Sequence, residues 1–199
     1  MNKALAPILA GCLLPVVLSG CAGLLAGGAA TGIAVVHDRR TAGQVLEDQS
    51  IEFKAASAID GDKGLSSQAH VSATSFNGIV LLTGEAPTAQ LRQRAADLVR
   101  AVPHVRRVDN EITIAAPSSL MSRSSDTLIT AKVKTSLLSV KGYPNFDPTR
   151  VKVVTENGTV YLMGLVTHGE GDAAANEARQ VSGVQRVVKL FEYINSAQN

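Results

Sequence analysis

The stretch TENGTVYLMG, residues 155–164, has an earlier counterpart in TSFNGIVLLTG, residues 74–84. Each joins an Asn-Gly pair to an apolar run that closes on a glycine. Asn-Gly between β-rich segments is typical of a type I′ turn, because both central residues need positive φ. Each stretch therefore predicts a β-hairpin. Four structural glycines follow from it, namely Gly78 and Gly158 in the turns and Gly84 and Gly164 at the ends of the second strands.

The similarity between the two halves extends to both sides of the hairpin. Before each hairpin, an aspartate suited to capping a helix precedes an apolar stripe at i, i+4 and i+8, namely Ile51, Ala55 and Ile59 behind Asp48, and Ile129, Val133 and Leu137 behind Asp126. After each hairpin we expect a second helix, over 88–101 and 172–181, and a final strand that includes 112–114 and 191–193. The sequence thus predicts an α+β fold of two tandem αββαβ units, each a small three-stranded mixed sheet with two helices on one face.

The first 20 residues have the features of a secretory signal peptide, with Lys3 ahead of an apolar segment at 4–18. The segment ends in Leu18-Ser19-Gly20-Cys21, which resembles the lipobox of bacterial lipoproteins. That resemblance implies that the Cys21 thiol is acylated and that residues 1–20 are removed. Ala22 after the cysteine implies, by the same resemblance, sorting to the outer membrane. The alternative is an ordinary signal peptide with a chance cysteine.

Residues 21–45 begin with a Gly- and Ala-rich tract and are predicted to form a lipidated flexible tether. In an alternative interpretation, its short apolar patches at 24–25 and 33–36 lie on the bilayer or on the folded domain. Residues 115–125 are rich in Pro and Ser, which predicts a linker between the two units, and we place its core at 117–124.

The αββαβ order, the V-x-(L/M)-x-G end of the hairpin and a V-x-x-V-x-x-V run before the last strand resemble the BON domain of bacterial envelope proteins. Two such units behind a lipobox, with the motif Asp38-Arg39-Arg40-Thr41 upstream, resemble the DolP (formerly YraP) family of dual-BON outer-membrane lipoproteins. The resemblance implies BON domain 1 at 46–116 and BON domain 2 at 125–195. It also implies a lipid-anchored protein of the outer membrane that faces the periplasm.

Motifs for catalysis and for cofactors are missing from the sequence. It has no Gly-x-Ser-x-Gly element, no glycine-rich phosphate loop and no paired-carboxylate motif, and its four histidines lack metal-ligand spacing. We therefore expect no enzyme, no metal and no cofactor. The net charge of +2 favours no particular partner, so any electrostatic recognition is local.

The first helices of the two units differ in charge. Residues 48–64 hold four acidic residues against two lysines, a net charge of −2, whereas residues 126–142 hold one acidic residue against three lysines, a net charge of +2. On a helical wheel Leu128 lies off the core stripe among lysines. An apolar residue flanked by lysines suits an anionic membrane surface, and a solvated basic helix is the alternative.

The family resemblance implies that the first helix of the second BON domain binds anionic phospholipid such as phosphatidylglycerol, in the inner leaflet of the outer membrane. We assign this binding to Leu128, Ile129, Ala131, Lys132, Lys134 and Thr135. Leu128 falls where the best-known family member has Trp, so an interface-anchoring indole is lost here. The alternative function is a periplasmic adaptor for an outer-membrane assembly machine, in which lipid serves only as the anchor.

A second basic group lies in the first unit. It comprises Arg92, Arg94, Arg100, Arg106 and Arg107. Such a group suggests nucleic acid in a cytoplasmic protein, but the export signal argues against nucleic acid as a partner here. Docking onto an acidic group in the second unit, at Glu170, Asp172 and Glu177, or onto a protein partner remains open, as does a solvated face.

Overall fold

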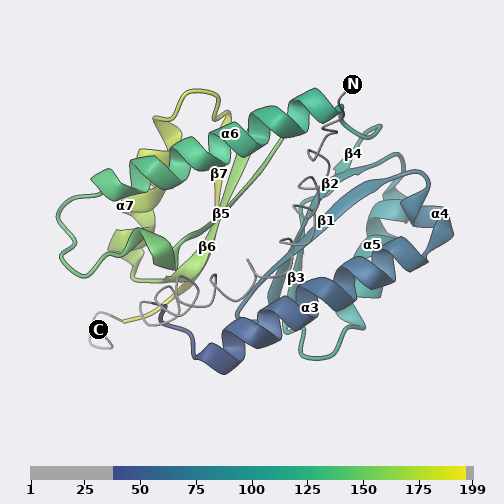
Figure 1. Ribbon diagram of the computed structural model, residues 1–199, viewed down its shortest axis with the longest axis horizontal. Coiled ribbons are helices and arrows are strands. Elements are labelled where there is room, and N and C mark those ends of the chain that lie inside the picture. The colour runs from purple at the N-terminus through teal and green to yellow at the C-terminus, as the bar shows by residue number, and fades with distance from the viewer. Residues whose placement is uncertain (1–37, 196–199) are drawn as a thin grey trace, which may run out of the picture.

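The computed structural model describes residues 38–195 (Figure 1). The first unit comprises α3 (Ala42–Gly61), α4 (Lys63–Ser66), β1 (His70–Phe76), β2 (Ile79–Ala86), α5 (Ala89–Arg100), β3 (Arg107–Asn110) and β4 (Thr113–Ile114). The second unit comprises α6 (Leu120–Ser136), η1 (Leu137–Ser139), η2 (Pro148–Arg150), β5 (Lys152–Glu156), β6 (Thr159–Val166), α7 (His168–Arg179) and β7 (Arg186–Tyr193). The predicted α+β fold with two small mixed sheets is confirmed.

The hairpin supplies the central strand of each sheet. β2 pairs antiparallel with β1 and parallel with β3 and β4, and β6 pairs antiparallel with β5 and parallel with β7. In the turns, Asn77 and Gly78 have φ of 52° and 74°, and Asn157 and Gly158 have φ of 47° and 71°. These are the positive φ values that a type I′ turn requires.

The final strand differs between the units. β7 is continuous, whereas the first unit interrupts this strand between β3 and β4 at Glu111 and Ile112. Ile112 is buried in the core beneath the helices. The interruption therefore adds an apolar side chain to the core, and the strand expected over 112–114 is reduced to Thr113–Ile114.

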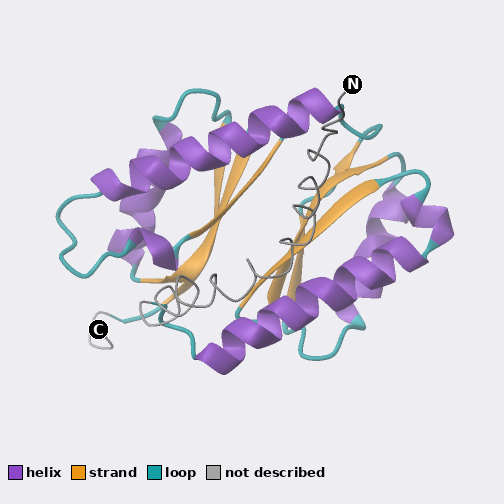
Figure 2. Ribbon diagram, viewed as in Figure 1, coloured by secondary structure: helices purple, strands orange, loops and turns teal. Residues whose placement is uncertain are grey.

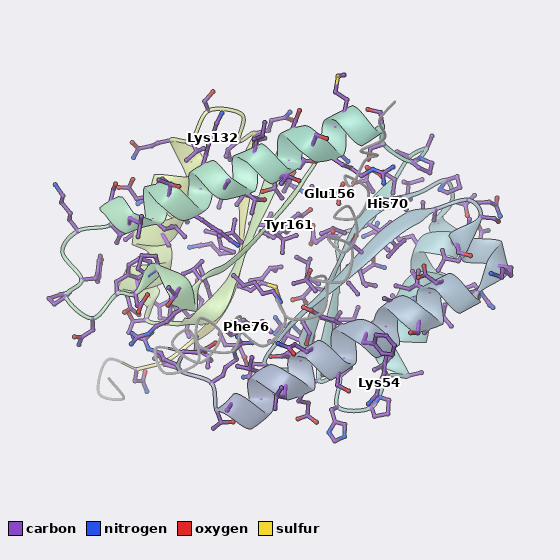
Figure 3. The ribbon with its side chains drawn as sticks, viewed as in Figure 1. Lys54, His70, Phe76, Lys132, Glu156 and Tyr161 are labelled. Atoms are coloured by element: carbon purple, nitrogen blue, oxygen red, sulfur yellow. The ribbon has the colours of Figure 1, made fainter. Side chains whose placement is uncertain are left out.

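The two sheets pack face to face, with the helices on the outside. In each unit the two main helices cover one face of the sheet over a core of aliphatic side chains. A third cluster lies between the sheets and joins Phe76, Ile79 and Leu81 of the first unit to Tyr161 and Met163 of the second. Figure 2 shows the resulting order of layers, helix, sheet, sheet and helix, and Figure 3 shows Phe76 and Tyr161 pointing between the sheets.

Reciprocal polar contacts fix the packing of the two units. The Asn77 amide of the first turn donates to Glu192 of β7 at 2.6 Å, and the Asn157 amide of the second turn donates to Glu85 of β2. Each hairpin turn thus binds a carboxylate on the other unit's sheet. Lys152 adds an ion pair with Glu52 at 2.6 Å.

Both first helices begin earlier than the sequence pattern indicates. Thr41 is the N-cap of α3 and Ser119 is the N-cap of α6. The tether predicted at 21–45 and the linker predicted at 117–124 therefore each contain the beginning of a helix. The apolar stripe alone locates the part of a helix that packs on the sheet, and the first turns extend beyond it.

Asp48 and Asp126, predicted as helix caps, lie inside α3 and α6 and bind the hairpin turns instead. The Asp48 carboxylate accepts hydrogen bonds from the backbone N–H of Asn77 at 2.7 Å and of Gly78 at 2.8 Å. Asp126 accepts the two equivalent bonds from the second turn, both at 2.9 Å. The capping prediction is wrong, because each aspartate serves a turn that follows it by about 30 residues in the chain.

The second helix of the second unit, α7, starts at His168 rather than at the expected residue 172. Thr167 and Glu170 form a capping box, in which each side chain binds the backbone N–H of the other residue. Gly169 and Gly171 in the first turn weaken the helical pattern in the sequence, so the true start was missed.

Gly84 and Gly164 lie within β2 and β6 and do not end them, because each strand continues for two more residues. A Cβ at Gly84 would lie 2.0 Å from the carbonyl oxygen of His70, and one at Gly164 would lie 2.6 Å from that of Arg150. Only Gly84 also has a positive φ, of 109°. The two glycines therefore share a close backbone neighbour but not a backbone conformation.

Candidate membrane interface

The outward face of α6 combines exposed apolar residues with lysines. Leu128 is 63% exposed, and Ala131, Lys132, Lys134 and Thr135 are exposed beside it. Among the described residues, neither lysine forms an ion pair. Figure 3 shows Lys132 projecting away from the sheets. The face thus offers unpaired positive charge around an apolar residue.

Ile129, predicted as part of the lipid-binding set, belongs to the core. It is 8% exposed and packs with Val133 and Leu137 beneath α6. Its side chain therefore cannot lie on the outward face, and its inclusion was wrong. Its position on the apolar stripe, one residue and therefore about 100° from Leu128, already places it toward the core.

Two exposed apolar residues of the same face were missed from the sequence. Met121 is 80% exposed and Leu138 is 73% exposed. Met121 lies two helical turns before Leu128 and was assigned to the linker, because the helix was expected to start near Asp126. Leu138 follows in η1. Together with Leu128, Ala131, Lys132, Lys134 and Thr135, they make up what we call the α6 surface.

A hollow of about 420 Å³ lies at the C-terminal end of the α6 surface. Its lining includes Lys134 and Leu138 from this surface, Arg40 and Phe76 from the first unit, and Lys152 from β5. Arg40 is paired with Asp38 and Asp48, and Lys152 is paired with Glu52. Lys134 is the cation of this group that makes no ion pair within residues 38–195. The hollow therefore presents positive charge beside apolar walls.

The segment Asp38-Arg39-Arg40-Thr41 joins the two units next to this hollow. The Arg39 guanidinium forms two hydrogen bonds with Glu170 of the second unit, at 2.9 and 3.0 Å. Arg40 donates to Asp48 of the first unit at 2.7 Å and lies 3.8 Å from the centre of the Phe76 ring. Adjacent arginines thus bind different units, and the chain enters the folded body beside Lys134.

The ion pairs of this segment shift the pKa values of Glu170 and Arg40 toward their charged forms. Burial acts to raise the pKa of Glu170, but hydrogen bonds from Arg39 and Thr167 outweigh it and hold the pKa below its usual value. Burial likewise acts to lower the pKa of Arg40, and its bonds to Asp38 and Asp48 reverse that effect and raise the pKa. Both shifts favour the charged form, the carboxylate of Glu170 and the guanidinium of Arg40.

The arginines of the first unit have partners near them. Arg94 pairs with Asp62, Arg100 with Asp97 and Arg107 with Asp109, and the Arg92 guanidinium donates to the carbonyl oxygen of Asn110. Arg106 alone of the five reaches the other unit, at Glu192. The acidic residues considered as docking partners lie elsewhere, since Glu170 binds Arg39 and Asp172 binds Lys189. Docking of the arginines onto that acidic group is therefore wrong.

The histidines and acidic side chains of residues 38–195 are spread over both units. No three His, Cys, Asp or Glu side chains there are grouped to hold a metal ion. His104 pairs with Glu47, and His168 stacks on Tyr193 with ring centres 3.9 Å apart. No helix in this part of the chain has the length and apolar character needed to cross a membrane. Cys21 and the predicted signal peptide lie outside the described residues.

Comparison with known proteins assigns both units to one domain family. The BON domain family matches residues 47–116 and 125–195. Outer membrane lipoprotein DolP of Haemophilus influenzae is 37% identical over 178 residues, which cover 89% of this chain and 91% of that protein. The 21 kDa hemolysin of Actinobacillus pleuropneumoniae is 35% identical over 79% of each chain. Osmotically-inducible protein Y of Escherichia coli is 27% identical over 73% of this chain and 72% of its own.

The structure explains why a duplicated match covers the chain so completely. Both units keep the Asn-Gly turn, the aspartate that binds it and the αββαβ order. Together with the 37% sequence identity to the DolP relative over 89% of the chain, these features show that the chain is a dual-BON protein of the DolP family.

Proposed function

We propose that this protein binds anionic phospholipid through the α6 surface, while a lipid on Cys21 holds it at the inner leaflet of the outer membrane on the periplasmic side. The observation that carries the proposal is the pair Lys132 and Lys134, which follow exposed Leu128 on α6 and form no ion pair among the described residues. A lysine near anionic headgroups contributes roughly 1 kcal/mol to membrane binding, and a leucine adds to binding by burying its side chain at the acyl boundary. The role is binding without catalysis.

The hollow beside Lys134 supports a headgroup site within this surface. A phosphate oxygen there meets the Lys134 ammonium, while acyl carbons meet Leu138 at the rim. The neighbouring cations Arg40 and Lys152 are already neutralised by carboxylates, so Lys134 is the cation of the hollow that is left for the headgroup. The α6 surface is thus suited to an anionic headgroup more than to a neutral one.

The expected anchor fits this arrangement. Sixteen residues, all outside the described range, lie between Cys21 and Asp38, and at about 3.4 Å for each of the 17 steps they span at most roughly 58 Å. The anchor therefore supplies proximity to the membrane, and the α6 surface supplies orientation. The name of the DolP relative, an outer membrane lipoprotein, supports the same location for this chain.

Vesicle binding tests the proposal on a chain that starts at residue 22, which lacks the anchor and keeps every described residue. We expect Leu128→Glu, and separately Lys132→Glu with Lys134→Glu, to weaken co-sedimentation with phosphatidylglycerol vesicles without lowering the melting temperature. Added salt should weaken binding too, since the attraction is screened over about 8–10 Å at physiological ionic strength. Lys54→Glu on α3 is the matched control and should leave binding unchanged.

Equal binding to neutral and anionic vesicles, or sensitivity to Lys54→Glu alone, would contradict the proposal. The adaptor function, with lipid only as the anchor, would then take its place. A separate measurement tests the anchor: Cys21→Ala should abolish metabolic labelling of the full chain with a clickable fatty acid, because acyl transfer needs the thiol.

A further inference from the structure

The outward face of α3 carries an exposed ridge that the function proposed above does not use. Gly43, Leu46, Ser50, Phe53 and Ser57 follow one another at steps of three and four residues, and all five are exposed. Leu46 is 66% exposed and Phe53 is 74% exposed. The ridge lies opposite the core stripe of the same helix. An exposed phenylalanine and leucine on one helix face, two turns apart, are a feature of helix–helix contacts.

The order of side chains along this α3 ridge alternates between small and large. Gly43, Ser50 and Ser57 are spaced by seven residues, and so are Leu46 and Phe53 between them. These are the a and d positions of a heptad pattern, with small residues at a and large ones at d. When two such helices run antiparallel, each large residue faces a small one, so Phe53 meets Ser50 of the second copy and Leu46 meets its Ser57. We propose that α3 is a contact surface for a second copy of this chain, in this antiparallel register.

The charges beside the ridge favour the same register. Glu47 and Lys54 lie on one flank of the ridge, seven residues apart. In the antiparallel register Glu47 faces Lys54 of the second copy, and symmetry repeats the pair. One Glu47 oxygen binds His104 at 2.9 Å, and the other is available for the lysine. Lys54 forms no ion pair among the described residues, and Figure 3 shows it on the outer side of α3.

The equivalent positions of α6 do not repeat this self-complementary pattern. Ser125 stands where Glu47 would be, and Lys132 stands where Lys54 is. In the same register of two α6 helices, each Lys132 would face Ser125 of the other copy, so no ion pair would form. Since α3 and α6 lie on opposite outer faces of the layered body (Figure 1), a contact through α3 leaves both α6 surfaces uncovered. The inference thus stands independently of the lipid proposal.

One pair of helices buries less than the roughly 1,000 Å² expected of a stable interface, so the contact is weak and transient. Covalent trapping of the full chain in the envelope of a Gram-negative host suits such a contact. We would introduce Ser50→Cys and treat cells with a short bismaleimide. In the antiparallel register two copies of residue 50 are offset by about 4.5 Å along the axis, which predicts a covalent dimer.

Ser57→Cys is the matched control on the same ridge. Its two copies are offset by about 16 Å along the axis in the antiparallel register, beyond the reach of the short reagent. Only the Ser50→Cys chain should therefore give a dimer above the background of the parent chain, whose two cysteines are Cys12 and Cys21. Equal dimer yields from both variants would indicate a parallel pair or random collision, and no dimer from Ser50→Cys would exclude the contact. Either result overturns the proposal.

Charge reversal separates the proposed partner from other occupants of the ridge. In the Ser50→Cys background, Glu47→Lys alone and Lys54→Glu alone should each abolish the covalent dimer, because each brings like charges together. The double variant should restore it, since the pair is re-formed with its signs exchanged. The covalent dimer is restored only if the partner carries the same two changes, which is the case when the partner is a second copy of this chain. A dimer insensitive to the single reversals, or one that the double variant fails to restore, contradicts a self-complementary contact through α3.

Discussion

The two BON domains are most alike in their hairpins and least alike on their outer helices. In both, an aspartate in the first helix binds an Asn-Gly turn through two backbone N–H groups. On the outer faces the large and small residues are exchanged: Leu46 and Phe53 of α3 correspond to Ser124 and Ala131 of α6. Duplication has thus preserved the contact that holds each hairpin turn, whereas the exposed faces of the two first helices have diverged in their side chains.

The largest expected effect concerns the glycines of the central strands. Gly84→Ala combines a positive φ with a Cβ 2.0 Å from a carbonyl oxygen, whereas Gly164→Ala meets only the close oxygen, at 2.6 Å. We expect Gly84→Ala to cost about 4 kcal/mol or more and Gly164→Ala to cost about 2 kcal/mol. Urea unfolding of both variants measures the difference. An unchanged urea midpoint for Gly84→Ala, or a larger loss of stability for Gly164→Ala than for Gly84→Ala, would contradict this prediction.

The next effect concerns the aspartates that bind the turns. Asp48 accepts four hydrogen bonds, from Ser75, Asn77, Gly78 and Arg40, whereas Asp126 accepts two backbone bonds from its turn. Asp48→Asn should therefore cost about 2–4 kcal/mol and Asp126→Asn about 1–3 kcal/mol, because buried donors are left with a weaker acceptor. Chemical unfolding at pH 7 gives both values. Equal losses would mean that Arg40 and Ser75 contribute little.

The contribution of Asp48 to the stability of the fold depends on pH in a defined direction. Burial acts to raise the pKa of Asp48, but hydrogen bonds from Gly78, Ser75 and Asn77 outweigh it, and the pKa lies below its usual value. The stabilisation is therefore complete above the unfolded pKa, near 4, and is lost as pH falls through the folded value. The difference between the wild type and Asp48→Asn should accordingly shrink in acid.

The fold was predictable from local signals, and its long-range contacts were not. The Asn-Gly pairs and the apolar stripes indicate hairpins and helices through their own spacing. The role of Asp48 depends on a turn that follows it by about 30 residues, and no local pattern reports that contact. The packing of one sheet on the other was missed for a related reason. Phe76 and Tyr161 form this contact. In the sequence, the alternation along each strand assigns them to one face of a sheet but does not indicate that this face packs on the other sheet.

The residue before the turn differs between the units, and a smaller effect follows from it. Phe76 in the first unit corresponds to Glu156 in the second, and both lie at the contact between the sheets. Burial and the carboxylates of Glu85 and Asp126 raise the pKa of Glu156 to about 7. Since this pKa exceeds that of a glutamate in the unfolded chain, the folded state binds the Glu156 proton more tightly than the unfolded state does. The stability of the protein should fall as pH rises from about 4.5 to 7 and then change little.

Glu156→Gln should remove this dependence. At pH 8 the variant should be more stable than the wild type by about 1–2 kcal/mol, and below pH 4.5 the two should converge. Thermal melts across this range measure it. Glu177→Gln on the outside of α7 is the control and should run parallel to the wild type. A wild type whose stability rises steadily with pH would contradict the raised pKa.

The candidate site was predictable in part, because a helical wheel separates Leu128 and the lysines from the core. The wheel gave no reason to keep Ile129, which is buried. It missed Met121, since the helix boundary was set too late, and it missed Leu138, which lies beyond α6 in η1. The hollow beside Lys134 depends on Arg40 and Phe76 from the first unit, and only the folded arrangement of the two units brings them together.

The smallest expected effect compares the two basic groups directly. Arg94 and Arg100 of α5 pair with Asp62 and Asp97 in their own unit, whereas Lys132 and Lys134 form no ion pair within residues 38–195. Exposed ion pairs of this kind contribute little to stability. We therefore expect Arg94→Gln with Arg100→Gln to leave both the melting temperature and the binding to phosphatidylglycerol vesicles unchanged.

Lys132→Gln with Lys134→Gln removes the same amount of positive charge from α6 and is the matched comparison. Under the proposed function it should weaken vesicle binding, because these lysines have no carboxylate partner among the described residues, whereas the arginines are paired with neighbouring carboxylates. Co-sedimentation of the two double variants at low salt measures the contrast. If the arginine variant lost as much binding as the lysine variant, binding would follow the net charge of the protein, and the α6 surface would have no special part in it.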